Sequence, residues 1–269
     1  DLASEYPSDD VEAFCSSRTS VFPSAAVEKL RAACTAPLAT GDVSADGHAF
    51  HADARGLMRL WSKPVSECRY VVAVDVGGRS SKSDWSVVAV LSVPERAAEL
   101  PRVVAQWRGH IDHDLLAAKS VAVARYYNNA FLVIESNTYE TSDFGSSSDS
   151  NIFILNRLAE TYSNVYRRES FDTLKKAASW RIGFHTNVST KKLLINNLIE
   201  VVREGLYVER DAGACNELLT YEQLESGAFT AREGCHDDML MTRAIALYVI
   251  SSRQVPARLP STFEQHQRW

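Results

Sequence analysis

A short, nearly continuous apolar run, YVVAVDV at residues 70–76, constrains the fold more than any other stretch of this sequence. Its residues are mostly β-branched or aromatic, and a run of this length and composition predicts a strand buried on both faces of a sheet. One carboxylate, Asp75, stands inside the run, and a glycine pair follows it. Burying a carboxylate is costly unless a cation, hydrogen-bond donors or a metal ion pairs with it. The sequence therefore predicts that other groups converge on Asp75.

The pattern beyond this run predicts an α/β fold. Strands are expected at 85–93 and 102–110, separated by turn-rich stretches, so that the first three strands form an antiparallel meander. A helical pattern at 113–128 then precedes a second buried run, AFLVIE at 130–135, and a helix between two strands predicts a parallel crossover. The expected fold is a mixed central sheet, an antiparallel meander followed by parallel strands, with helices on its faces.

The remaining segments are less regular. We expect loops and short helices over 1–66, a loop over 137–150 and a polar connection over 167–179. Helices are expected at 151–162, 189–202, 215–221 and 236–250, the last of them strongly apolar.

The composition narrows the class of protein. The formal net charge of −5 on 269 residues argues against binding nucleic acid by bulk electrostatics alone, although it is compatible with a local basic patch. No apolar stretch reaches the roughly 18 residues of a membrane span, and the first residues lack a secretory signal, so we expect no membrane association and no secretion. Because the sequence begins with Asp1 and not with Met, we expect a processed or excised chain.

Acidic residues recur where buried elements end or begin. Glu135 ends the second buried run as Asp75 nearly ends the first, and neighbouring central strands would bring both carboxylates into one crevice. The sequence CHDDM adds Asp237 and Asp238 at the first turn of the last helix, where the helix dipole favours acids. Three such positions would form an oxygen-rich site for Mg²⁺ or Mn²⁺. Two ions about 3.5–4 Å apart can activate a water and stabilise the leaving oxygen in phosphodiester hydrolysis.

Simpler explanations exist for each acid taken alone. Asp75 and Glu135 are compatible with ordinary strand-end acids in turns, and Asp237 or Asp238 with a helix N-cap. His236 is compatible with a packed or solvated histidine as well as with a ligand. The occurrence of all the acids in one chain favours the metal site.

The order of these motifs resembles a known family. A meander starting with Asp, a crossover helix, a strand ending in Glu and a late helix starting His-Asp-Asp is similar to the RNase H-like (resolvase/integrase-type) nuclease domain of viral and phage terminase large subunits. The resemblance extends to EYPSDDVEAF at 5–14, similar to the exit from the packaging ATPase, to GFHT at 183–186 and to ELLTY at 217–221. No GxxxxGK[ST] phosphate loop is present, so the chain looks like the nuclease half alone.

The resemblance implies roles for particular residues. Asp75, Glu135 and Asp238 would be catalytic metal ligands for two Mg²⁺ or Mn²⁺ ions, with Asp237 as a further or alternative ligand. Two auxiliary residues and four DNA-phosphate contacts complete the expected site: Asp84 and His236, and Arg79, Lys82, Lys191 and Lys192.

The resemblance also implies function and organisation. The expected activity is endonucleolytic cutting of concatemeric double-stranded DNA by two metal ions, with little sequence specificity. The expected partners are a terminase ATPase domain, a small subunit and a portal. The expected location is the interior of the host cell. Residues 1–66 would be a lead-in from the ATPase, 67–252 the nuclease domain and 253–269 a tail. Two alternatives stay open: an actin- or sugar-kinase-like nucleotide binder, suggested by VDVGGRS and by Asp211-Ala-Gly213, and another RNase H-like nuclease such as a junction resolvase.

Overall fold

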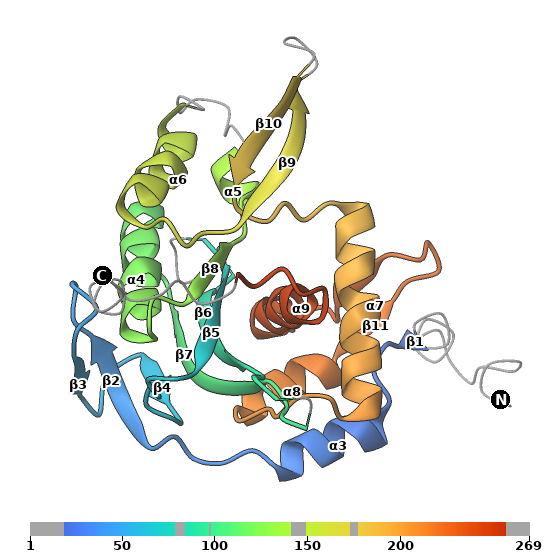
Figure 1. Cartoon of the computed structure of the whole chain (residues 1–269). Coiled ribbons are helices and arrows are strands. Elements are labelled where there is room, and N and C mark those ends of the chain that lie inside the picture. Colours follow the sequence, from blue (N-terminus) through green and yellow to red (C-terminus); the bar gives the residue numbers. More distant parts are fainter. Residues whose placement is uncertain (1–18, 79–83, 97, 141–148, 173–176, 257–269) are drawn as a thin grey trace, which may run out of the picture.

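A seven-stranded mixed sheet forms the centre of the computed structural model, which describes residues 19–78, 84–96, 98–140, 149–172 and 177–256 (Figure 1). The strand order is β3-β2-β4-β7-β6-β5-β8. The strands are β2 (Ala39–Val43), β3 (Phe50–Ala52), β4 (Met58–Leu60), β5 (Arg69–Asp75), β6 (Ser86–Val93), β7 (Arg102–Gly109) and β8 (Phe131–Ile134).

The pairing of the central strands follows the sequence-based prediction. β5, β6 and β7 form an antiparallel meander, and β8 pairs with β5 in parallel. The predicted meander and crossover are therefore confirmed. The register places Asp75 opposite Val87 and Val87 opposite Arg108. Residues directly opposite each other point to the same face of a sheet, so these three side chains form a row across three strands.

Helices cover both faces of the sheet (Figure 1). One face packs against α4 (His113–Tyr126) and α6 (Asp149–Thr161), and the short α5 (Asn137–Glu140) follows β8. The other face packs against α3 (Ser24–Ala32), α7 (Val188–Glu204), α8 (Ala212–Leu219) and α9 (Asp238–Ser251). No helix in these described ranges is both long and apolar enough to cross a membrane.

The helix α9 lies at the centre of this second layer. Its residues are apolar on nearly every side and most are fully buried, which is the pattern of a helix surrounded by protein. It packs against both β5 and β6. The neighbouring helix α7 begins with a reciprocal capping box between Asn187 and Thr190 and ends at Gly205, whose φ of 66° suits a left-handed C-cap. The contacts of α9 with β5 and β6 place this helix against the central strands of the sheet.

Three sequence-based predictions of local structure were wrong. The loop expected over 137–150 begins with the short helix α5. The polar connection expected over 167–179 is largely a hairpin of β9 (Arg167–Asp172) and β10 (Ala177–Ile182), which stands out from the body of the protein in Figure 1. The strands of residues 39–60 were expected to be loops or short helices. The strands of residues 39–60 are short, and β9 and β10 are polar in sequence. Neither group shows the alternation of apolar and polar residues that predicts a strand.

The first part of the chain packs with the rest. β2 pairs with β4, and β4 pairs with β7, so residues 39–60 extend the same sheet. A small sheet of β1 (Thr19–Ser20), β11 (Tyr221–Gln223) and β12 (Phe229–Ala231) also joins early and late segments. The division of the chain at residues 66 and 252 stays a prediction, and the motif at 5–14 lies outside the described residues.

Candidate metal centre

The carboxylates of Asp75 and Glu135 lie next to each other at the ends of two central strands. Asp75 is the last residue of β5, and Glu135 follows β8 directly. Val74 pairs with Ile134, and the Glu135 N–H donates to the Val74 carbonyl oxygen at 3.0 Å. Since side chains alternate along a strand, Asp75 and Glu135 both point to the face covered by α9.

The electrostatics of Asp75 show that four acids meet here. Burial raises the pKa of Asp75 well above its ordinary value, and the neighbouring Glu135 carboxylate raises it further. Asp238 and Asp237 act on this pKa in the same direction. The acids at the ends of the two strands and at the start of α9 therefore lie close enough to act on one another, and their role as metal ligands stays a prediction.

Asp238 begins α9 and is almost completely buried, with 3% of its side chain exposed. Burial raises its pKa to about 6, against the opposing effects of Arg108 and His236. Asp237 occupies the N-cap position, yet its side chain makes no capping hydrogen bond within the described part of the chain. The N–H of Leu240 donates instead to Glu217 Oε2 at 2.8 Å. The simple N-cap explanation therefore does not account for Asp237.

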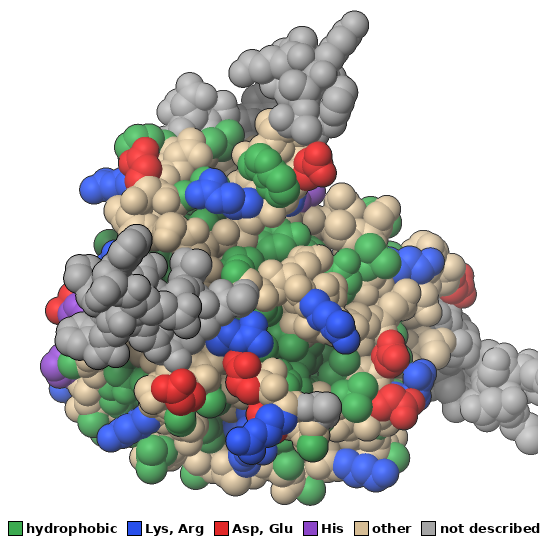
Figure 2. All heavy atoms as spheres, viewed as in Figure 1, with side chains coloured by type: hydrophobic (Ala, Val, Ile, Leu, Met, Phe, Trp, Pro, Cys, Tyr) green, Lys and Arg blue, Asp and Glu red, His purple; other side chains and the backbone are tan. Residues whose placement is uncertain are grey.

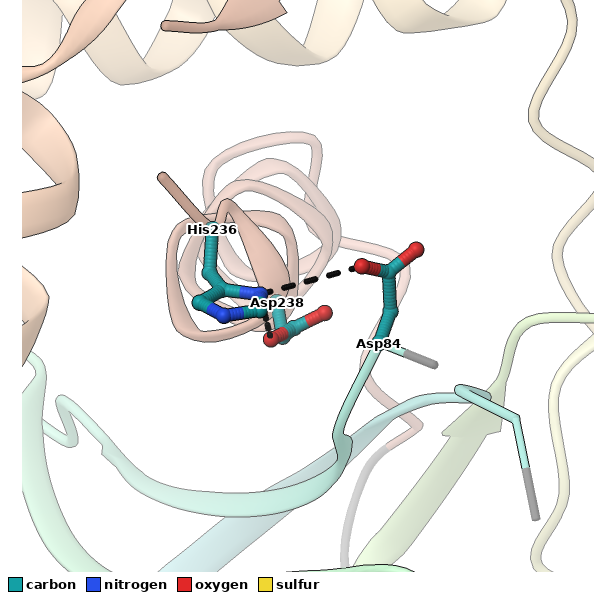
Figure 3. Close-up of side chains that lie close together, drawn as sticks. All are labelled: Asp84, His236 and Asp238. Carbon is teal, nitrogen blue, oxygen red and sulfur yellow. Dashed lines mark ion pairs between the residues drawn. The ribbon is translucent and has the colours of Figure 1, made fainter. Parts of the chain in front are cut away.

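Asp84 and His236 lie beside Asp238 (Figure 3). The Nδ1 atom of His236 is 3.7 Å from Asp84 Oδ1 and 3.6 Å from Asp238 Oδ2. One donor atom from each of the three residues lies within 4.8 Å of the other two. Figure 3 shows Asp84 coming from the segment before β6 and the other two residues from the start of α9. The two predicted auxiliary residues thus adjoin the acids.

The glycine pair explains how Asp84 reaches this position. The N–H of Gly78 donates to the Asp84 carbonyl oxygen at 3.0 Å. A Cβ atom added at Gly77 would lie 2.3 Å from that same oxygen, which no side chain tolerates. The glycine therefore lets the backbone after β5 pass closely by the backbone before β6.

Two charged residues beside Asp238 were not predicted from the sequence. Arg108 of β7 places Nη2 3.4 Å from Asp238 Oδ2 and 3.9 Å from Glu217 Oε1. Glu217 of α8 is buried, and burial raises its pKa to about 7. The cross-strand row from Asp75 to Arg108 would have identified the arginine, but only once the strand register was known.

The predicted DNA-contacting residues differ in their placement. Lys191 Nζ lies 3.6 Å from Asp237 Oδ2, so this lysine adjoins the acids, whereas Lys192 is exposed on α7. Arg79 and Lys82 lie outside the described residues. On the face shown in Figure 2, basic and acidic side chains of the described residues are intermixed rather than gathered into one basic stripe.

The donor set fits a hard divalent ion. Most of the candidate donors are carboxylate oxygens, with one imidazole nitrogen, and such sets suit Mg²⁺ and Mn²⁺. The raised pKa of Asp75 reports carboxylates that repel one another in a poorly hydrated place. A divalent cation would relieve this repulsion. Among the described residues, Asp84, His236 and Asp238 have donor atoms close enough together to hold one ion. The ligand set of Asp75, Glu135, Asp237 and Asp238 stays a prediction.

The nucleotide-binding alternative loses one of its two motifs. Asp211 is buried, and its Oδ1 accepts from the N–H of Gly213 at 2.9 Å as the N-cap of α8. Its Oδ2 accepts from Gln106 at 3.0 Å and from Arg59 at 2.8 Å. These partners give Asp211 a structural role and no access to a phosphate.

The burial of Asp75 beside other carboxylates leads to a prediction for the stability of the protein. In EDTA at pH 8, Asp75→Asn is expected to melt a few degrees above the wild type, since about 1 kcal/mol corresponds to roughly 2–4 °C for a chain of this size. The raised pKa of Asp75 means that its ionisation destabilises the folded state as the pH rises above the ordinary carboxyl pKa of about 4. The difference should therefore shrink as the pH is lowered toward 4.

Thermal melts with and without Mn²⁺ check this prediction. The metal should raise the melting temperature of the wild type more than that of the variant, because only the wild type offers the full set of ligands. A variant that melts below the wild type in EDTA at pH 8, or gains as much from Mn²⁺, contradicts it.

Comparison with solved structures identifies the fold. The large terminase nuclease from the thermophilic phage G20c, with bound magnesium, aligns with a TM-score of 0.52 at 17% identity, covering 82% of this chain and 95% of that chain. The same nuclease with bound cobalt aligns with a TM-score of 0.51 at 17% identity, over 82% and 95% of the two chains. No protein-family model and no curated protein sequence matches this sequence. The chain thus has an RNase H-like fold, the fold of large terminase nuclease domains, as predicted.

Proposed function

We propose that this chain is a metal-dependent DNA endonuclease domain of a viral DNA-packaging terminase. The observation that carries the proposal is the convergence of Asp75, Glu135 and Asp238 on one face of the sheet. The structural likeness to a phage terminase nuclease that binds magnesium and cobalt supports it. The substrate is double-stranded concatemeric DNA, cut with little sequence preference with the help of two Mg²⁺ or Mn²⁺ ions.

Each part of the site has a distinct task in this reaction. When bound, the divalent ions would activate the attacking water and stabilise the leaving oxygen. Asp75 and Glu135, on two rigid strands, set one side of the ion site, and Asp238 sets the other from α9. Asp84 and His236 lie beside Asp238, where they would help to hold a divalent ion. No side-chain nucleophile is required.

The proposal extends to the assembly in which such a domain works. A terminase ATPase domain, a small subunit and a portal would present DNA to this site, inside the host cell. The intermixed charges on the face shown in Figure 2 and the net charge of −5 favour weak binding of DNA by the isolated domain. We therefore expect the isolated chain to cut slowly and the assembled complex to cut faster.

Incubation of the purified protein with supercoiled plasmid tests the activity. Reactions in EDTA, Mg²⁺ and Mn²⁺ are compared by the conversion of supercoiled to nicked and linear DNA. The proposal expects conversion with either metal and none in EDTA. Cleavage that persists in EDTA, or no cleavage with any metal even in the presence of the ATPase and small subunit, would overturn it.

Neutralising the two lysines at the start of α7 is expected to weaken DNA binding. The double variant Lys191→Gln/Lys192→Gln should lower the slope of log Kd against log salt by about 0.9 for each phosphate that the protein no longer neutralises. Binding of a duplex is measured over a range of salt concentrations. Lys29→Gln/Lys63→Gln, which changes two exposed lysines outside α7, is the matched control. An unchanged slope in the Lys191/Lys192 variant refutes the role of these lysines in phosphate binding.

A further inference from the structure

Arg108 brings a positive charge into the acidic centre. It lies in the same cross-strand row as Asp75, with Val87 between them, so its side chain faces α9 and not the opposite layer. Its Nη2 atom lies near both Asp238 and Glu217. The arginine therefore occupies the side of the site that is opposite Glu135, with Asp75 in between.

The guanidinium of Arg108 is held in place, but one of its N–H groups has no hydrogen-bond acceptor among the described residues. Its carbon lies 5.0 Å from the centre of the Trp85 ring, and that ring stacks on His110 with centroids 4.0 Å apart. Its Nε atom is buried and has no hydrogen-bond partner among the described residues. A buried donor without an acceptor is unfavourable, so the arginine keeps capacity for a further anion. Its side chain is 29% exposed, which leaves it reachable from solvent.

A metal ion bound by Asp238 would compete with Arg108 for one oxygen. Asp238 Oδ2 lies 3.4 Å from Arg108 Nη2 and 3.6 Å from His236 Nδ1. A divalent ion bound by Asp238 would displace the single positive charge of the guanidinium. The freed guanidinium would then lie beside the ion, with a planar fork that matches the oxygens of a phosphate.

We propose that Arg108 is the phosphate-binding cation of this site, held by Asp238 until a divalent ion takes that carboxylate. The proposal rests on the proposed nuclease function, because it needs a phosphodiester as substrate. In the metal-free protein Arg108 neutralises Asp238, and in the loaded site it contacts the scissile phosphate and stabilises the charge that develops there. If Arg108 and Asp238 only held β7 against α9, replacing the arginine would weaken the binding of Mn²⁺ instead of strengthening it.

The test measures metal binding and cleavage separately. Mn²⁺ affinity is measured by electron paramagnetic resonance of the free ion, and kcat and KM are measured with plasmid DNA. Arg108→Gln removes the charge, Arg108→Lys keeps the charge without the fork, and Arg102→Gln removes an exposed arginine from the other end of the same strand as the control.

Opposite effects on binding and catalysis are expected. Arg108→Gln should bind Mn²⁺ about 3- to 10-fold more tightly, since it loses a competing cation. Its kcat should fall by about 100-fold or more, as on removal of a transition-state donor, and Arg108→Lys should recover part of this loss. Arg102→Gln should match the wild type in both.

The outcomes separate this proposal from the broader one. Weaker Mn²⁺ binding by Arg108→Gln, the result expected of a structural pair, or unchanged kcat overturns the role of Arg108 alone. If the wild type itself neither binds Mn²⁺ nor cuts DNA, the nuclease function fails and the role of Arg108 fails with it.

Discussion

Cleavage of plasmid DNA is expected to fall on the order of a thousandfold when Asp75 is replaced by Asn. Metal-assisted stabilisation amounts to several kcal/mol, and each 1.4 kcal/mol is a factor of ten in rate. Burial and the carboxylates of Glu135, Asp238 and Asp237 all raise the pKa of Asp75. Asparagine keeps the size of the side chain and removes the charge that a cation requires. Nicking rates in Mg²⁺ and Mn²⁺ measure the effect.

A matched control makes this result specific. Asp114→Asn changes an exposed acid at the start of α4, on the opposite face of the sheet, and should leave cleavage unchanged. Circular dichroism and the melting temperature should show that Asp75→Asn is folded. A folded Asp75→Asn protein that cuts at the wild-type rate would exclude this residue from the site.

A second large effect is expected at Arg243, in the buried network behind the site. Arg243 is 1% exposed and donates from Nε and Nη2 to the two oxygens of Glu209, both at 3.0 Å, while Glu209 is fully buried. Its Nη1 donates to Gln106 Oε1 at 2.5 Å. Arg243→Met would leave the Glu209 carboxylate buried without its cation, which costs about 3–5 kcal/mol. Urea unfolding should show this loss of stability.

The double variant Arg243→Met/Glu209→Gln tests the cause. Glu209 Oε1 also accepts from the N–H groups of Arg210 and Asp211 at 2.9 Å, and a glutamine oxygen can keep these bonds. The double variant should therefore recover much of the stability lost in the single variant. Arg203→Met, which changes a half-exposed arginine on α7, should cost under about 0.5 kcal/mol. A loss of the same small size in Arg243→Met would contradict the importance of the pair.

This network connects stability to the site. Arg243 and Asp238 lie on the same helix, and Gln106 and Arg108 lie on the same strand. The bonds of Arg243 to Gln106 and Glu209 therefore fix α9 against β7, which sets the distance between Asp238 and Arg108. Loss of the network should loosen the site before the whole protein unfolds.

The positions of the acids could be predicted because each acid stands within or next to a run of apolar residues. Asp75 and Glu135 each interrupt or end a run of apolar residues, and such runs identify buried strands from sequence alone. The apolar pattern of α9 likewise placed Asp237 and Asp238 at a helix start. The order of strands and helix then predicted the parallel pairing that brings Asp75 beside Glu135.

Other parts of the site depend on contacts that no local pattern shows. Arg108 and Asp238 are 130 residues apart in sequence, and Glu217 reaches α9 by bonding a backbone N–H. Their proximity follows from the register of β6 with β7 and from the packing of α8 on α9. The hairpin of β9 and β10 was missed for a related reason, since its polar strands pair with each other at the edge of the protein and carry no apolar alternation.

A crystal structure of the protein soaked with Mn²⁺ tests whether the carboxylates of Asp75 and Asp238 bind a metal ion. Anomalous scattering from manganese locates the ion without any assumption about activity. An anomalous peak is expected within bonding distance of the carboxylates of Asp75 and Asp238, and it should be lost in Asp75→Asn crystals. Crystals soaked with Mn²⁺ that show no peak at these carboxylates would contradict a metal-dependent site at this end of the sheet.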